Sequence, residues 1–282
     1  MDPHDYFIFS VMTKHIVLCA DDYGQTQAIS QGIIKLIQMG RVTATSCMVN
    51  MPLWADHAKW LHPFYKQIDM GLHLNLTRGE PLSKEYKEIY HQFFPLDKLL
   101  RYALFRRLKP EVIEAECHAQ IDCFANTLGF LPHFIDSHQH VHQFPIVRQA
   151  LIQAYEKRLR RQHAYIRLVN GKLKFKIKEA RKILIHTTGT RALKRLLTIN
   201  HIPHNLSFAG TYPDTDGIPY NELFPLFLQD ISNKGLIMCH PSLKPPNEEP
   251  IAKARFAEYQ YLVGGRFLKD CHERGVYLTK FR

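Results

Sequence analysis

Short apolar runs alternate with longer amphipathic segments along most of the chain. The run at 15–20 (HIVLCA) is apolar after its first residue, which is typical of a strand buried on both faces. In the next segment, 26–39, Ile29, Ile33 and Ile37 recur every fourth position, the spacing of one helix face. A strand, a polar turn and a helix therefore form the unit that the rest of the chain repeats.

The same unit recurs downstream as far as the last residues. Further strands are expected at 45–50, 68–76, 133–137, 165–169, 206–209, 235–239 and 276–279, and further helices at 111–128, 145–158, 220–232 and 252–275. Strands separated by helices pair in parallel, so the pattern predicts an α/β fold, a distorted (β/α) barrel of about seven parallel strands. An open doubly wound sheet is the alternative. Residues 78–109 are expected to form a long insertion of the kind that covers active sites.

The length and composition are those of one globular domain. No Gly-, Ser- and Pro-rich stretch divides the 282 residues, so we expect a single domain over 13–282 and a loose tail over 1–12. Translation starts at Met1 or at Met12. No apolar run is long enough for a transmembrane segment, and none of the six cysteines forms a CxxC pair, which favours a reducing cytoplasmic location.

The chain is basic, with 37 Lys and Arg against 26 Asp and Glu and a net charge of +11. Much of the excess lies at 172–195, where a solvated insertion is the favoured interpretation and a patch facing an anion or a membrane is the alternative. No RNA-binding signature or zinc finger accompanies it, so we expect no nucleic-acid partner.

Reactive side chains follow several of the expected strands, and the carboxyl ends of parallel strands meet at one rim. Asp21 and Asp22 follow the first strand. One carboxylate of such a pair can bind a metal while the other moves protons. A helix cap or a turn also uses Asp, but two together after a buried strand favour a functional site.

The segment 136–142 (DSHQHVH) is rich in histidine, the commonest neutral metal ligand. His138, His140 and His142 alternate, so in extended structure they share a face. Not all three need to be ligands, and Asp136 can orient a ligating imidazole.

Two more histidines belong to expected strands. His73 and Asn75 share the face opposite to the leucines of GLHLNL, which makes His73 a candidate third ligand. His240 precedes Pro241 at a strand end, where it can donate a proton to a leaving group. One Asp and two His leave coordination positions open, as in catalytic sites, and imidazole suits zinc, iron or cobalt better than magnesium.

Six motifs in this order identify a family resemblance. They are ADDYG (20–24), TS…MVN (45–50), GLHLNL (71–76), DSHQHVH (136–142), IRL (166–168) and MCHPS (238–242). Over nearly its whole length the chain resembles the YdjC-like carbohydrate deacetylases, a group that includes chitooligosaccharide deacetylase and the hopanoid-biosynthesis-associated deacetylase-like proteins. Tyr23 stands where this group has Phe, and the basic segment 172–195 is not explained by the resemblance.

The resemblance implies a distorted barrel, a carbohydrate substrate and hydrolysis of an N-acetyl group from an amino sugar of the N-acetylglucosamine type. It implies metal ligation by Asp22, His73 and His138, with Asp21 as the general base and His240 as the general acid. We expect Arg167, Asn75 and His142 to contact the substrate. The resemblance points to magnesium and the ligand chemistry to zinc. It is also compatible with a homodimer.

Two other functions remain as alternatives. One is a different metal-dependent amidase or a phosphohydrolase on the same scaffold, which release of acetate or of phosphate distinguishes. The other is a non-catalytic sugar- or anion-binding protein, for which sugar binding without metal would be evidence.

Overall fold

The computed structural model describes residues 13–171, 189–212, 218–245 and 251–281. The tail expected at 1–12 and residues 172–188 of the basic segment lie outside these ranges. The strands are β1 Lys14–Tyr23, β2 Ala44–Cys47, β3 Asp69–Leu74, β4 Phe134–Ser137, β5 Tyr165–Ile166, β6 Phe208–Ala209, β7 Leu236–Cys239 and β8 Val276–Leu278. The α-helices are α1 Gln27–Gln38, α2 Trp54–Leu61, α3 Lys84–Tyr90, α4 Leu96–Leu104, α5 Pro110–Leu128, α6 Val147–Arg158, α8 Thr190–Ile199, α9 Tyr220–Asp230, α10 Ala252–Val263 and α11 Gly265–Glu273.

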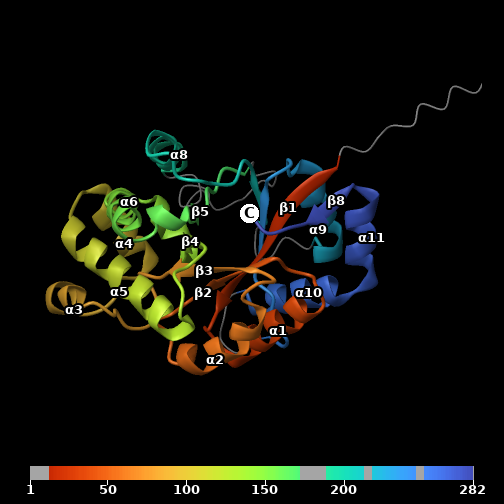
Figure 1. The fold of residues 1–282 in the computed structure, drawn as a ribbon, viewed down its shortest axis with the longest axis horizontal. Coiled ribbons are helices and arrows are strands. Elements are labelled where there is room, and N and C mark those ends of the chain that lie inside the picture. The colour runs from red at the N-terminus through yellow and green to blue at the C-terminus, as the bar shows by residue number, and fades with distance from the viewer. Residues whose placement is uncertain (1–12, 172–188, 213–217, 246–250, 282) are drawn as a thin grey trace, which may run out of the picture.

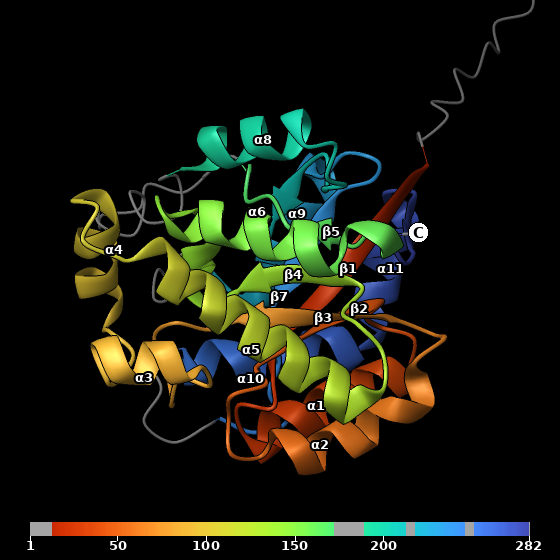
Figure 2. The ribbon, with the colours of Figure 1, turned by 60° about the vertical axis from the view of Figure 1, so that its left-hand side comes forward.

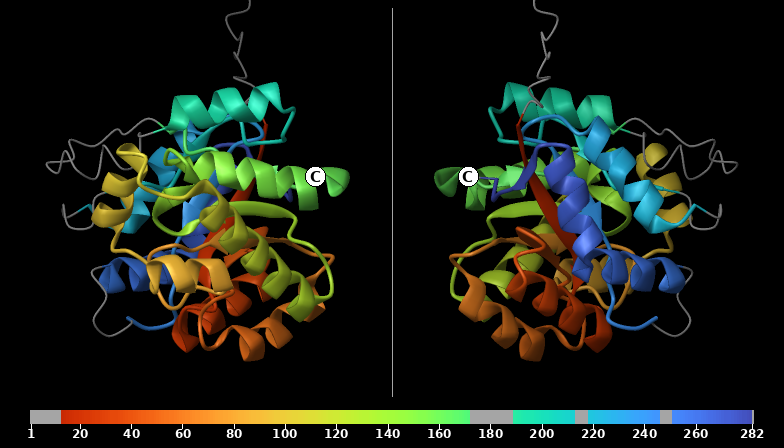
Figure 3. Two further views of the ribbon diagram at one scale, coloured as in Figure 1. Left: turned by 90° about the vertical axis from the view of Figure 1, so that its left-hand side faces the viewer. Right: turned by 90° about the vertical axis from the view of Figure 1, so that its right-hand side faces the viewer.

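The strands form one parallel sheet in the order β5-β4-β3-β2-β1-β7-β6, and β8 pairs with the start of β1. The sheet is curled, and helices pack around its outside (Figures 1 and 3). The prediction of a distorted barrel of about seven parallel strands is therefore confirmed. All carboxyl ends of these strands point to the same rim, because every pair is parallel.

The curl is not closed by a strand ladder between β5 and β6 in the part of the chain that the structure describes. The Ile166 N–H donates to the carbonyl of Pro203 at 2.9 Å. The Asn205 side chain accepts from the N–H of Leu168 at 2.8 Å and donates to its carbonyl at 2.9 Å. A backbone hydrogen bond and the amide side chains of Asn205 and Asn170 thus bridge the two edge segments.

Helices cover the outer face of the sheet. Neighbouring helices contact one another in the order α6, α5, α2, α1 and α10, and α10 also contacts α9 and α11. Figure 2 shows α5 and α6 lying across the strands, with α3 and α4 at one end of the molecule. Both short helices belong to the predicted insertion at 78–109, and whether it acts as a lid stays a prediction. Among the described residues no helix has the length and apolarity to cross a membrane.

Strand alternation separates two apolar clusters. On β1, Leu18 packs outward in the large core under the helices, whereas Val17 and Cys19 belong to a smaller cluster inside the curl. Gly71 allows the Phe134 ring into this interior, because a Cβ at Gly71 would lie 2.4 Å from the ring. The interior is therefore filled by side chains rather than by a channel.

One predicted helix is wrong in its length. A single helix was expected over 252–275, but α10 ends at Val263 and α11 begins at Gly265. Gly264 between them is extended, with φ −73° and ψ 158°. Two consecutive glycines lose helical stability because of their backbone freedom, which allows the chain to turn there.

Candidate metal centre

Asp22 at the carboxyl end of β1 is the centre of the site. Its backbone has φ 68°, a left-handed conformation that Asp tolerates better than most residues. The side chain is buried, and its two oxygens face different partners. Oδ2 accepts from Nη2 of Arg255 at 2.6 Å, while Oδ1 faces two histidines.

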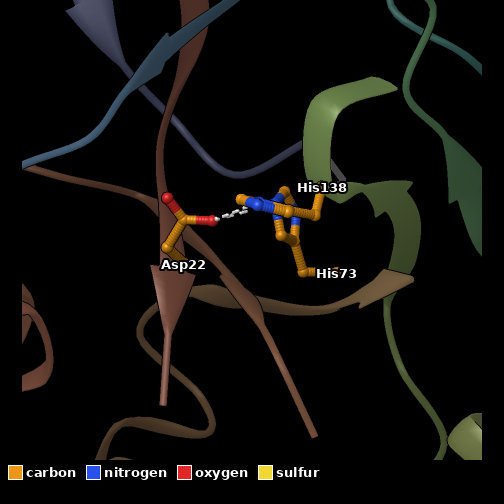
Figure 4. Close-up of side chains that lie close together, drawn as sticks. All are labelled: Asp22, His73 and His138. Atoms are coloured by element: carbon orange, nitrogen blue, oxygen red, sulfur yellow. Dashed lines mark hydrogen bonds and ion pairs between the residues drawn. The ribbon is translucent and has the colours of Figure 1, made fainter. Parts of the chain in front are cut away.

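His73 on β3 and His138 after β4 converge on that oxygen. Nε2 of His73 lies 3.2 Å and Nδ1 of His138 lies 3.0 Å from Oδ1 of Asp22. Figure 4 shows both rings beside the carboxylate. Ligand atoms of these three residues all lie within 4.8 Å of one another. Three strand ends far apart in sequence thus present one oxygen and two nitrogens to one point.

A second layer of polar side chains fixes the His73 ring. Nδ1 of His73 lies 2.6 Å from Oδ1 of Asp136, and the Ser46 hydroxyl contacts both groups. Burial alone would lower the pKa of His73, but the carboxylate of Asp136 raises it to about 10. A proton on Nδ1 directed to Asp136 leaves Nε2 as the atom available to a metal ion.

Arg167, which follows β5, joins two carboxylates. Its guanidinium binds both oxygens of Asp21, at 2.5 and 2.6 Å, and Oδ2 of Asp136 at 2.6 Å. The arginine is fully buried, and although burial lowers its pKa, Asp136 and Asp21 raise it well above the usual value. Its donors are directed to carboxylates inside the protein, and its predicted contact with substrate stays a prediction.

Asn75 and His142 also have internal roles. The Asn75 amide accepts from the N–H of Thr77 and Arg78 and donates to Asn50 and to the carbonyl of Arg78. The imidazole of His142 has Ser137 on one nitrogen and the carbonyl of Arg167 on the other. Both side chains are fully buried and hydrogen-bonded inside the protein, and their contact with substrate stays a prediction.

The histidine-rich segment is a turn rather than an extended strand. His138–Gln143 forms a 3-10 turn in which Gln139 (φ 55°) and His140 (φ 56°) are left-handed. The three histidines therefore do not share a face, and His138 alone of them reaches Asp22. The expected alternation of the three histidines is therefore not what brings His138 to Asp22. His138 reaches Asp22 because it directly follows the end of β4.

His240 lies at the end of β7 and lines a pocket of about 120 Å³ together with Tyr212, Arg255 and Glu258. Burial lowers the pKa of His240 to about 4, against the effect of the carboxylates of Asp22 and Asp21. Burial also raises the pKa of Glu258 to about 7, although Tyr212 and the His240 backbone lower it.

The donor set of Asp22, His73 and His138 fits a divalent ion. Two donors bound at about 2.1 Å and at right angles to each other lie about 3 Å apart, which matches the two separations from Oδ1 of Asp22. A second group, Cys19, Asp21 and Asp136, also brings donor atoms together. Arg167 already supplies the positive charge between these two carboxylates, so we assign no ion there.

The comparison with known protein families decides the family of this chain. The YdjC-like protein family matches residues 15–273. The chain belongs to this family. A carbohydrate deacetylase of Danio rerio is 33% identical over 146 residues, which are 49% of this chain and 45% of that protein. A carbohydrate deacetylase of Clostridium beijerinckii is 26% identical over 274 residues, which are 95% of this chain and 98% of that protein.

For some YdjC-like relatives the match covers only part of their length. The chain spans 45% of the Danio rerio protein and 61% of the carbohydrate deacetylase of Halalkalibacterium halodurans. A solved structure from Enterococcus faecalis V583, described as a candidate cellobiose-phosphate cleavage protein, has a TM-score of 0.67 and 19% identity over 96% of this chain and 98% of that one. This likeness supports the fold alone.

Two residues of this YdjC-like site were missed in the sequence. Arg255 and Glu258 lie three positions apart on α10, and both are buried at 1% exposure. Opposite charges at this spacing are usually a solvated pair on a helix surface. Their contacts at the rim depend on where α10 packs against the barrel, and the periodicity of the helix does not predict that position.

Proposed function

We propose that this protein is a metal-dependent carbohydrate deacetylase that hydrolyses the N-acetyl group of an amino sugar and releases acetate. The observation that carries the proposal is the convergence of Asp22, His73 and His138, whose donor atoms lie within 4.8 Å of one another. The relatives named carbohydrate deacetylase supply the substrate class.

Asp22, His73 and His138 would hold the ion, which is magnesium by family resemblance and zinc by ligand chemistry. When bound, a divalent ion polarises the acetyl carbonyl and lowers the pKa of a nearby water. Three protein ligands leave positions open for water and substrate, as catalytic sites require.

Asp21 is the proposed base. It lies next to Asp22 at the rim, and Arg167 holds both of its oxygens in fixed directions. Each carboxylate oxygen has two lone pairs, so an oxygen that accepts from Arg167 can still accept a proton from the attacking water. The arginine thus orients the base without occupying its full capacity.

His240 is the proposed donor to the leaving nitrogen. With its pKa lowered to about 4, the ring is neutral at pH 7 before the reaction starts. It therefore acts as a relay, in which the proton that the water gives to Asp21 passes through His240 to the leaving nitrogen. One proton leaves the water and one reaches the amine, so the transfer balances.

A metal-reconstituted assay tests the function. Metal-free protein is loaded with Zn²⁺, Mg²⁺ or Co²⁺ and given N-acetylglucosamine oligomers, and acetate is measured. We expect release that depends on metal and that Asp22→Asn removes. Release of phosphate from a generic phosphate ester, with no acetate from any N-acetyl sugar, would instead favour a phosphohydrolase on this scaffold.

A further inference from the structure

The helix α10 carries two buried charges toward the rim. Arg255 and Glu258 lie on the same helix face as the buried Tyr259 and Leu262. A buried charge is costly unless it is paired and hydrogen-bonded. The partners of these two side chains therefore indicate what the two residues do. Both find their partners at the proposed site rather than in each other.

Arg255 binds the metal-facing carboxylate. Its Nη2 donates to Oδ2 of Asp22 at 2.6 Å, which leaves Oδ1 directed to His73 and His138. The carbonyl of Arg255 also accepts from the N–H of Ser242 at 3.1 Å. The arginine therefore selects which oxygen faces the ion and ties its helix to the segment after β7.

Glu258 binds a backbone N–H and a side-chain hydroxyl in the pocket beside His240. One carboxylate oxygen accepts from the N–H of His240, and the other accepts from the hydroxyl of Tyr212. His240 follows β7 and Tyr212 follows β6, so one carboxylate joins two neighbouring strand ends. No other element among the described residues supplies a side-chain acceptor to that His240 N–H.

We infer that Arg255 and Glu258 are positioning residues, Arg255 for the ligand Asp22 and Glu258 for the proton relay His240. The inference rests on the proposed function. It means that one helix sets the geometry of both the metal centre and the proton donor. Residues that orient a metal ligand typically contribute about 10–100-fold to metal affinity or activity.

The Arg255 part is tested by metal affinity alone. Zn²⁺ is titrated into metal-free protein in competition with a chromophoric chelator. We expect Arg255→Met to weaken Zn²⁺ binding by about 10–100-fold and Arg255→Lys to restore part of the loss, because Lys keeps the charge but not the geometry. Lys253→Met, an exposed charge on the same helix, is the matched control. Affinity of Arg255→Met within twofold of wild type would overturn this part.

If Arg255→Met does not fold, Arg255→Lys decides alone. Its Zn²⁺ affinity must then fall at least about threefold below that of wild type, since Lys is a point charge and cannot reproduce the planar donor. The absorption spectrum of the Co²⁺ form gives a second readout, because it changes when the coordination of Asp22 changes.

The Glu258 part is tested by hydrogen exchange and by kinetics. We expect Glu258→Met to raise the exchange rate of the His240 amide by at least about tenfold, while Zn²⁺ affinity stays within twofold. With an N-acetyl sugar, kcat should fall by about 10–100-fold with little change in KM, and the pH profile should shift. Glu258→Gln, which keeps an acceptor for the His240 N–H, should recover most of both losses.

Unchanged amide exchange in Glu258→Met would overturn the role of Glu258 whatever the activity. Absence of any acetate release from the wild type would instead remove the proposed function, while the Zn²⁺ affinities and the amide exchange would still report on the two positioning contacts. The two failures are thus distinguishable.

Discussion

Arg167 and Asp21 form a two-pronged ion pair inside the barrel, with Nη1 to Oδ2 at 2.5 Å and Nη2 to Oδ1 at 2.6 Å. Asp136 extends the pair to a third buried charge. The proposed base and the carboxylate that orients His73 therefore depend on a single guanidinium.

Replacing this guanidinium should destabilise the fold. Arg167→Met removes the buried counter-charge of Asp21 and leaves Asp136 with His73 as its charged partner, and breaking a buried pair in this way costs about 3–5 kcal/mol. Urea denaturation measures the loss. Arg158→Met, which removes a surface pair with Asp122, is the control and should lose much less. Equal losses in the two variants would contradict the account of the buried cluster.

Asp22→Asn should abolish stoichiometric metal binding without unfolding the protein. Asn also tolerates the left-handed backbone at this position (φ 68°), so the fold is expected to persist. Metal content after reconstitution and gel filtration gives the readout. The exposed Asp56→Asn is the matched control. A variant at Asp22 that retained one ion per chain would show that these three residues are not the ligand set.

Asp21→Asn and His240→Gln should each lower kcat by about 10²–10⁴-fold while leaving metal content unchanged, because a positioned acid or base contributes on that scale. The measurement is steady-state acetate release from the best substrate found. Turnover equal to that of wild type in both variants would remove the proposed proton path.

His142 should make the fold acid-sensitive. Burial, partly offset by Asp136 and the Arg167 carbonyl, lowers its pKa from 6.5 to about 4. As the pH falls below about 6.5, His142 binds a proton in the unfolded chain but stays neutral in the folded protein. The free energy of unfolding therefore decreases progressively down to about pH 4. The loss from this group amounts to about 3 kcal/mol.

The test for His142 compares unfolding free energies at pH 7 and pH 4. His142→Asn should be less stable than wild type at pH 7, and the gap should shrink by about 3 kcal/mol at pH 4. The exposed His62→Asn serves as the control. A gap that stayed constant with pH would contradict the burial of a neutral ring.

Gly71→Ala should destabilise the barrel interior by about 1–3 kcal/mol through overpacking, since the added Cβ would meet the Phe134 ring at 2.4 Å. Adding Phe134→Leu should recover part of the loss in a double-mutant cycle. Gly265→Ala, with open space around its Cβ position, is the control and should be near neutral. Additive effects of the two interior changes would show that the ring and the glycine are not in contact.

The fold was predictable because it follows from the order of strands and helices along the chain. Alternating strands and helices impose parallel pairing, and parallel pairing brings the ends of β1, β3 and β4 to one rim. Parallel pairing therefore placed the Asp21–Asp22 pair, His73 and the histidines of 138–142 at one rim, and the family resemblance selected Asp22, His73 and His138 among them. The same reasoning correctly set the barrel at about seven strands.

The role of each polar residue was less predictable, because it depends on what lies across the barrel. Arg167 has the appearance of a substrate contact at a strand end, and only the positions of Asp21 and Asp136 make it an internal ion pair. Arg255 comes from a helix more than 200 residues after Asp22 in the chain. Strand periodicity holds no information about that docking.

β1, the first strand that the structure describes, is an internal strand of its sheet, between β2 and β7. One edge of β1 pairs with a strand that begins about 20 residues later, whereas Val17 on the other edge aligns with Leu236. During synthesis, that second edge of β1 stays unpaired until β7 has been made, which is after most of the chain. An unpaired apolar edge invites association with other chains, so expression yield should depend on chaperone supply more than the stability of the finished fold would suggest.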